Sequence, residues 1–321
     1  MSWAADLIRL ATLEDANTRI VLLGCGILGA AAGSVGSLAV LRGRALVGDA
    51  VAHAALPGVC LAWLVLGDRS LPVLLLGALG SGLLGVATIA AIRAQPRIRE
   101  DAAIALVLST FFGAGIVLSR MVQNVPGGHR AGLDGLILGS AASLVRQDVF
   151  AIGVVAAAAL GAVLLFFKEL RLLCFDRSFA ASLGRPVGAF DLALLAAVCL
   201  IAIAGLPAVG VVLVVALLVI PGAAARFWSD RLAAVVILAG LFGAAAALAG
   251  TALSAVLPAP AGARVRGWPT GPLIALAAAG LFAGSLVAAP RRGLIARLLG
   301  ARRLAAPQQG APDALPEERS R

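Results

Sequence analysis

The stretch LALLAAVCLIAIAGLPAVGVVLVVALLVI, residues 192–220, contains no charged side chain and is interrupted only by the turn-forming sequence GLPAVG at 205–210. A helix needs about 20 apolar residues to cross the hydrocarbon core of a bilayer. In lipid, a helix satisfies its own backbone hydrogen bonds, which an irregular segment cannot do. We therefore expect two membrane-spanning helices here, over 188–206 and 208–225, joined by a tight turn at Pro207.

The rest of the chain continues this pattern. Of its 321 residues, 61% are apolar and only 13% are charged, and the mean hydropathy is +1.02. A soluble domain of this length cannot bury so much apolar surface, so the bilayer is the expected solvent. The fold class predicted is all-α, a polytopic membrane helix bundle of eight or nine transmembrane helices. The further expected spans are 19–41, 44–66, 71–93, 102–120, 149–168, 231–257 and 272–290.

Three parts are expected along the chain. Residues 1–18 have acidic side chains and no long apolar core, so they do not resemble a signal peptide and predict a short interfacial helix. Residues 19–290 form the transmembrane domain. Residues 291–321 begin with basic side chains and continue as a Pro-rich, polar segment that we expect to be disordered.

The formal net charge of +10 comes from arginines grouped in short clusters between apolar runs. This distribution is typical of cytoplasmic loops and not of a nucleic-acid-binding face. Clusters follow every odd-numbered span, which predicts an N-terminus outside the cell membrane and a cytoplasmic C-terminus. The residues are Arg42 and Arg44, then Arg93, Arg97 and Arg99, then Lys168, Arg171, Arg177 and Arg185, then Arg226 and Arg231, then Arg291, Arg292 and Arg297.

Small residues recur at the spacing that lets helices approach closely in lipid. Gly26 and Gly33 in the first span, and Gly82 in the third, are the helix-packing positions predicted from this pattern. The four cysteines are scattered without CxxC spacing, so we expect reduced structural cysteines rather than a disulfide framework or a zinc site.

One helix carries two polar side chains that need an explanation. In LVGDAVAHAALPG, residues 46–58, Asp49 and His53 stand four positions apart and therefore share a helix face. Carboxylate and imidazole together suit zinc, manganese and iron, so the pair is a candidate site for a divalent cation. The alternative is structural, with Asp49 accepting a hydrogen bond from His53 or a neighbouring helix.

The remaining polar candidates have simpler interpretations. Glu100 and Asp101 open a span, where acidic side chains favour a helix N-terminus. Asp191 begins a span and is expected at the membrane interface. His129 lies in a predicted outside loop, where it is either plain solvent-exposed surface or a contact for a gate or partner. The loop at 168–188 predicts a short amphipathic helix from Phe175 to Leu183, which is either a docking element or a connector.

Four stretches in this order resemble signature regions of the ABC-3 family, the permease subunits of bacterial ABC importers for zinc, manganese and iron. They are LRGRALVGDAVAHAALPGV, AGLDGLILGSAASLVRQDV, KELRLLCFDRSFAASLGRPV and VGVVLVVALLVIPGAAARF, and the likeness covers roughly residues 19–290. Two departures stand out: IPGAAA replaces the more usual IPAATA at Ile220–Ala225, and about six extra residues lie near Arg264 to Trp268.

The resemblance implies a fold like that of type II ABC importer permeases, in the bacterial inner membrane. It implies a dimer with itself or a homologous permease, a cytoplasmic pair of ABC ATPase subunits, and an extracytoplasmic metal-binding receptor protein. The family's GD-x-x-x-H pattern falls on Asp49 and His53, which would contact the metal. Its ATPase-coupling segment falls on Glu169, Asp176 and Gly184.

The chain has no GxxxxGK[ST] loop, so ATP hydrolysis is expected in a separate subunit and the chain itself is not an enzyme. The transported divalent metal is the expected ligand, with no permanently bound cofactor and with membrane lipid as the other partner. Two alternatives remain: a permease for a metal chelate such as cobalamin or a siderophore, and an intramembrane enzyme using Asp49 and His53 as an acid–base pair.

Overall fold

The structure is a computed structural model that describes residues 16–67, 70–95, 97–125, 144–257 and 268–290, with a few isolated positions besides. The interfacial segment predicted over 1–18 and the tail predicted over 291–321 lie almost wholly outside these residues. His129 and the extra residues that begin at Arg264 lie outside them too, except for Trp268.

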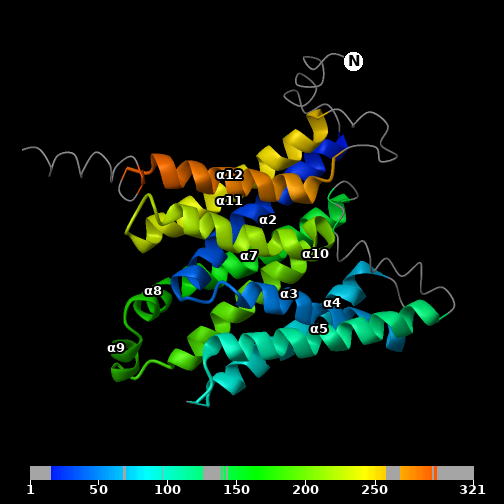
Figure 1. Cartoon of the computed structure of the whole chain (residues 1–321), viewed down its shortest axis with the longest axis horizontal. Helices are drawn as coiled ribbons and strands as arrows, with labels where there is room; N and C mark the ends of the chain where they lie inside the picture. The colour runs from blue at the N-terminus through cyan, green and yellow to red at the C-terminus, as the bar shows by residue number, and fades with distance from the viewer. Residues whose placement is uncertain are drawn as a thin grey trace, which may run out of the picture.

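The described part of the chain contains helices and no strand, which confirms the predicted all-α bundle (Figure 1). Eight of these helices are long and apolar enough to cross a membrane. The helices are α2 (Ala16–Leu41), α3 (Val47–Leu66), α4 (Leu71–Arg93), α5 (Glu100–Asn124), α7 (Arg146–Leu165), α8 (Phe167–Phe175), α9 (Arg177–Ser182), α10 (Val187–Ala225), α11 (Leu232–Val256) and α12 (Thr270–Ala288).

Helix α10 is a hairpin of two limbs. Its 39 residues would extend about 58 Å as one straight helix, roughly twice the thickness of the hydrocarbon core. Gly210 breaks it with a φ of 76° and a ψ of 170°, a conformation open essentially only to glycine. Val198 and Leu218, from the two limbs, both lie beside Gly48 of α3, which requires the chain to fold back. The predicted turn at 205–210 therefore separates two limbs, so the eight spanning helices of the described ranges amount to nine candidate membrane-spanning segments.

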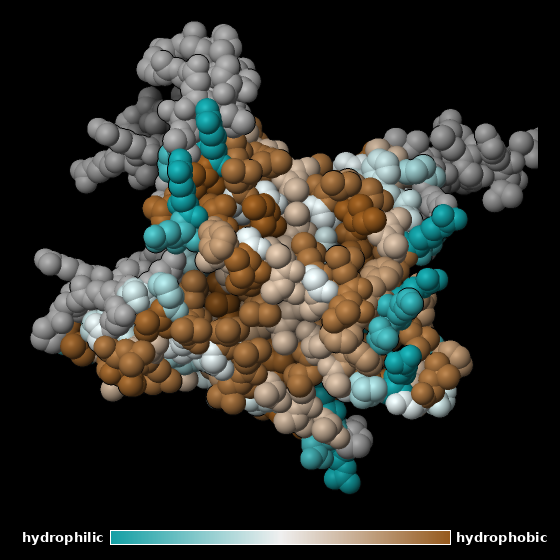
Figure 2. All heavy atoms as spheres, turned by 180° about the vertical axis from the view of Figure 1, so that it is seen from behind, coloured by the Kyte–Doolittle hydropathy of each residue, from teal (hydrophilic) through white to brown (hydrophobic). Residues whose placement is uncertain are grey.

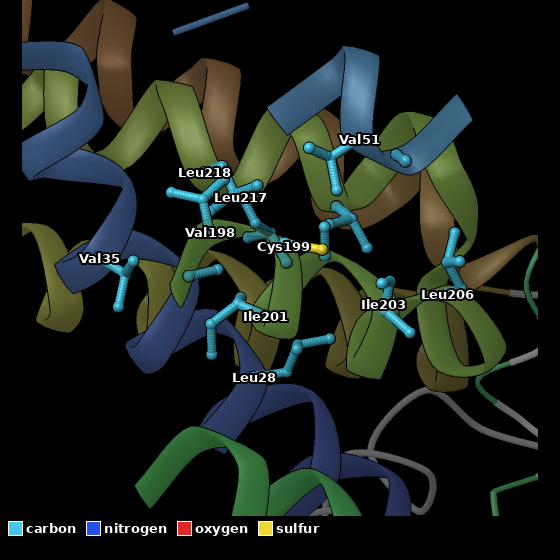
Figure 3. Packing of buried hydrophobic residues seen from close by; sticks show 14 of the residues in the cluster. Leu28, Val35, Val51, Val198, Cys199, Ile201, Ile203, Leu206, Leu217 and Leu218 are labelled. Carbon is cyan, nitrogen blue, oxygen red and sulfur yellow. The ribbon is translucent and has the colours of Figure 1, made fainter. Parts of the chain in front are cut away.

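The hairpin forms the centre of the bundle. Figure 1 shows α10 running between α2, α11 and α12 on one side and α3, α4 and α5 on the other. Its two limbs meet α2 and α3 in one continuous core, which includes Cys199 and Leu217 of α10, Val51 of α3 and Val35 of α2 (Figure 3). Outer helices such as α5 and α12 keep many apolar side chains on the surface.

The surface agrees with a bilayer environment. Figure 2 shows a broad apolar area across the middle of the molecule, with hydrophilic residues confined to its edges. Exposed leucine, valine and phenylalanine side chains cover several helices, among them Val65, Leu76, Val117 and Leu164. An area of this kind is costly in water and is the normal outer surface of a membrane protein.

The predicted packing glycines differ in how closely a neighbour approaches. A methyl group at Gly33 would lie 2.8 Å from the carbonyl carbon of Ala239 in α11, so the two backbones are in direct contact. At Gly82 it would lie 2.9 Å from the side chains of Cys199 and Ile203. At Gly26 the nearest atom, from Leu248, is 3.4 Å away, which is an ordinary contact.

Candidate functional site

The first turns of α3 carry the Asp49–His53 pair. α3 begins at Val47, three residues later than predicted, so Asp49 lies in its first turn and His53 one turn further on. The imidazole Nε2 of His53 is 3.5 Å from Oδ1 of Asp49. A carboxylate in the first turn is stabilised by the helix dipole, which gives Asp49 a structural role in addition to any role toward a ligand.

The pair lies on an open stripe in the first half of α3, where most other side chains are buried. Most of α3 is enclosed by α4, α5 and α10, whereas the side chains of Asp49 and His53 are 38% and 29% exposed. Leu46 and Leu56 continue the stripe at helical spacing. Burying a charged carboxylate against lipid costs several kcal/mol, about 3 on insertion scales. The stripe must therefore face water, a ligand or another protein chain.

Phe112 of α5 borders the pair. Its ring meets the imidazole of His53 edge to face, with centroids 4.8 Å apart and an interplanar angle of 74°. This geometry is favourable for aromatic pairs and limits how the imidazole rotates. The sequence analysis did not identify Phe112, because the contact depends on how α3 and α5 cross.

Asp49 and His53 supply two ligands that suit a divalent transition metal. Within the described ranges, no cluster of three or more His, Cys, Asp or Glu side chains could hold a metal ion. Such metals usually take four or more ligands. A metal ion at Asp49 and His53 would therefore need ligands from water or from another chain. All four cysteines are free, in agreement with the expected absence of disulfides.

The residues assigned to ATPase coupling lie in α8 and α9, where the sequence predicted a single helix. Asp176 separates these two helices and caps α9, since its Oδ1 accepts hydrogen bonds from the backbone N–H of Phe179 (2.9 Å) and the hydroxyl of Ser178 (2.6 Å). These bonds hold the pKa of Asp176 below its ordinary value. Glu169 pairs with Arg185 at 3.7 Å, and Gly184 ends α9 with a φ of 70°.

This segment presents apolar side chains outward. Phe175, Phe179 and Leu183 are exposed, whereas Leu173 and Ala180 pack inward against Val187 at the start of α10. A short helix pair with large apolar side chains pointing away from its own bundle is typical of a surface that contacts another protein. Figure 1 shows α8 and α9 projecting from one end of the bundle.

An ionic cluster lies at the same end, and the sequence analysis missed it. Asp191, expected at the membrane interface, has a side chain only 5% exposed and accepts hydrogen bonds from Arg42 (2.8 Å) and Arg44 (2.9 Å). Arg44 is 2% exposed and its Nε lies 2.8 Å from Oε1 of Glu100, a close approach that is misaligned for a hydrogen bond. The ionic cluster consists of Arg42, Arg44, Arg93, Glu100, Arg177 and Asp191.

The cluster joins the loop between α2 and α3, the facing ends of α4 and α5, helix α9 and the start of α10. Glu100 opens α5 as expected but makes no side-chain cap there, because its carboxylate is engaged by arginines. The signal in the sequence was Asp191 itself, an isolated carboxylate at the edge of an uncharged span, which needs a partner. We call this end of the bundle the basic end.

Comparison with known proteins identifies relatives over nearly the whole chain. The model of the ABC 3 transport family matches residues 14–289. The manganese transport system membrane protein MntC of Bacillus subtilis is 44% identical over 91% of this chain, which spans 65% of that relative's length. The zinc transport system membrane protein TroC of Treponema pallidum is 39% identical, with 92% of this chain and 97% of the relative covered.

Solved structures agree with these sequence matches. PsaBC from Streptococcus pneumoniae, solved in complex with Fab, superposes with a TM-score of 0.75 at 30% identity, covering 93% of this chain and 99% of that chain. A metal-chelate type ABC transporter in an inward-facing conformation gives a TM-score of 0.62 at 18% identity over 83% of this chain and 84% of that one, which indicates a shared fold alone.

Proposed function

The chain belongs to the ABC 3 transport family, and from this premise we propose that it is the membrane-spanning subunit of an ATP-driven importer for divalent transition metal ions. Manganese, zinc and iron are the cargo class. The names of the Bacillus subtilis and Treponema pallidum relatives, which refer to manganese and zinc transport systems, support this class.

The observation that carries the proposal is the Asp49–His53 pair on the open stripe of α3. An intramembrane carboxylate beside an imidazole is costly unless it serves a ligand or a polar path. The two groups together match the ligand preferences of the proposed metals. We infer that Asp49 and His53 contact the metal ion as it crosses the membrane.

Two ligands from one chain make an incomplete site, which supports a dimer. If a second copy or a homologous permease presented its own α3 stripe across a shared axis, the site would contain two carboxylates and two imidazoles. A site of this kind would also be easy to open, because each protomer holds only half of the ligands. Weak holding is what a transport path requires, since the ion must leave as readily as it enters.

We further propose that the basic end faces the cytoplasm and contacts the ATPase subunits through α8 and α9. The positive-inside rule favours this orientation, because the described arginine-rich loops converge there. Glu169, Asp176 and Gly184 would then shape the docking element, and the exposed Phe175 and Phe179 would enter the ATPase. The opposite end of the bundle would receive the metal from an extracytoplasmic receptor protein.

The direct test is metal uptake by cells that express this chain with its ATPase and receptor, read by elemental analysis for manganese, zinc and iron. Asp49→Asn and His53→Ala should each reduce accumulation of one metal by about tenfold or more at equal membrane levels. Asp101→Asn, an exposed carboxylate at the start of α5, is the matched control and should retain uptake.

Each outcome of this test has a definite meaning. Loss in both variants with retention in the control assigns the pair to the cargo path and names the metal. Full uptake in Asp49→Asn and His53→Ala would make the pair structural and would contradict the proposed site. Uptake of a siderophore-bound or corrin-bound metal, without uptake of free ions, would instead favour the chelate alternative.

A further inference from the structure

The ionic cluster connects α8, part of the proposed docking element, to the start of α3, which carries the candidate metal site. Arg42 donates one hydrogen bond to the carbonyl oxygen of Leu173 in α8 (2.6 Å) and another to Asp191. Arg44 shares that carboxylate and lies five residues before Asp49. A displacement of α8 therefore reaches the first turn of α3 through Arg42, Asp191 and Arg44.

Helix α9 and the end of α4 reach the same carboxylate, that of Asp191. The guanidinium of Arg177 in α9 is 3.9 Å from Oδ2 of Asp191, and its side chain is 58% exposed at the docking surface. Arg93 at the end of α4 is almost equally close to Glu100 (3.4 Å) and to Asp191 (3.6 Å). Asp191 is thus the group in which contacts from both sides of the bundle meet.

The cluster is not fully satisfied, so its pairing can change. Four arginines face two carboxylates, and neither Nη1 of Arg44 nor Nε of Arg42 has a hydrogen-bond partner among the described residues. A polar network with unpaired donors and two nearly equivalent acceptors has alternative arrangements of similar energy. Packed interfaces move between such discrete arrangements rather than deforming continuously.

We propose that Asp191 is a positioning residue that couples movement of α8 and α9 to the start of α3. When the docking element shifts, the arginines exchange partners around the Asp191 carboxylate, and Arg44 moves the turn that carries Asp49. This inference rests on the proposed function, since it concerns how ATPase contact is transmitted to the metal site. A purely structural cluster would tie the helix ends together without linking hydrolysis to transport.

The test measures manganese uptake and ATP hydrolysis in the same proteoliposomes, which contain the permease, its ATPase subunits and its receptor. The quantity compared is manganese transported per ATP hydrolysed. Asp191→Asn should lower this ratio about fivefold or more while hydrolysis continues, because couplings between sites are typically of this size. Asp191→Glu keeps a carboxylate at this position, so its ratio should be at least about half of the wild-type ratio.

Arg177→Gln provides a second variant that leaves the buried part of the cluster intact. Since the Arg177 side chain is mostly exposed, its removal should not prevent folding. It should lower the ratio about twofold. Arg226→Gln after α10 is the matched control: it makes the same charge change at an exposed arginine outside α8, α9 and the ionic cluster, and it should keep the wild-type ratio.

The outcomes distinguish failure of the coupling role from failure of the proposed transport function. A wild-type ratio in both Asp191→Asn and Arg177→Gln would overturn the coupling role. If Asp191→Asn does not assemble, the Arg177→Gln ratio decides, and equality with Arg226→Gln overturns the inference. If the wild-type importer hydrolyses ATP but moves neither manganese, zinc nor iron, the proposed function fails and the coupling role fails with it.

Discussion

Replacing Gly58 by alanine should displace the helix that carries the candidate metal site. α3 and α4 cross at Gly58 and Gly77, and a methyl group at Gly58 would overlap the carbonyl oxygen of Gly77. It would also lie 2.5 Å from Cβ of Ser81 and 2.7 Å from the carbonyl carbon of Gly77. Because backbone atoms cannot rotate away, the two helices must separate.

The size of the effect follows from these distances. Non-bonded carbon atoms rest about 3.5–4.0 Å apart, so the helices would have to move apart by about 1 Å. Overpacking of this kind costs about 1–3 kcal/mol, and the upper part of the range applies where backbone meets backbone. The hydrogen bond from Ser81 Oγ to the carbonyl oxygen of Ala54, now 2.5 Å, would lengthen as well.

The assay is thermal unfolding of the purified protein in detergent, combined with metal uptake in cells. Gly58→Ala should lower the unfolding temperature by several degrees, since about 1 kcal/mol corresponds to about 2–4 °C in a mid-sized domain. Uptake should fall too, because His53 lies five residues away on the displaced helix. Gly80→Ala in α4 is the matched control, with no atom within 4 Å of the added methyl group.

Two results would refute this reasoning. Gly58→Ala could unfold at the wild-type temperature, which would mean that α3 and α4 do not cross at Gly58. Alternatively, Gly80→Ala could destabilise the protein as much as Gly58→Ala does. The loss would then reflect the helix backbone itself, although alanine normally favours a helix over glycine by about 1 kcal/mol.

Three further predictions concern single contacts. Phe112→Ala frees the imidazole of His53 and should raise the half-saturating manganese concentration for uptake about two- to tenfold, whereas Phe112→Leu should have a smaller effect. Gly210→Ala places a side chain at a φ of 76° and should cost about 1–3 kcal/mol of unfolding free energy, while Gly153→Ala in α7 should not. Asp176→Ala removes the cap of α9 and should speed hydrogen exchange of the Phe179 amide. The folded protein lowers the pKa of Asp176, so the wild-type cap is complete above about pH 4 and is lost as the pH falls further.

Much of the fold follows from the sequence, because apolar length alone marks a membrane span. The 29 uncharged residues at 192–220 predicted two spans, and the structure breaks α10 at Gly210, inside the predicted turn. Spacing also identified Gly33 and Gly82 as small positions, but the residues that approach them, Ala239 of α11 and Cys199 of α10, could not be found from the sequence. Helix order does not determine which helices cross, or at what height.

For a related reason, the sequence identified only part of the candidate site. Asp49 and His53 are neighbours on one helix, so a spacing rule brings them together. Phe112 and Asp191 act through contacts between helices that are far apart in the chain, and no periodicity reports such contacts. The arginines near Asp191 were assigned to loops because the positive-inside rule considers only the number of basic residues in a loop and not their ion-pair partners.

The charge of the ionic cluster bears on the path proposed for the metal. Its four arginines exceed its two carboxylates, so the cluster carries a formal excess of two positive charges at the basic end. Asp49 lies five residues after Arg44, which is in the loop that leads into α3. On the proposed path, a divalent cation moving from Asp49 toward that end would meet repulsion, because protein shields charge less than water does. Rearrangement of the cluster, or insertion of acidic groups from a partner, would lower this barrier. Under the proposed function, the same residues would both raise the barrier to the ion and contact α8 and α9, which the ATPase is proposed to move.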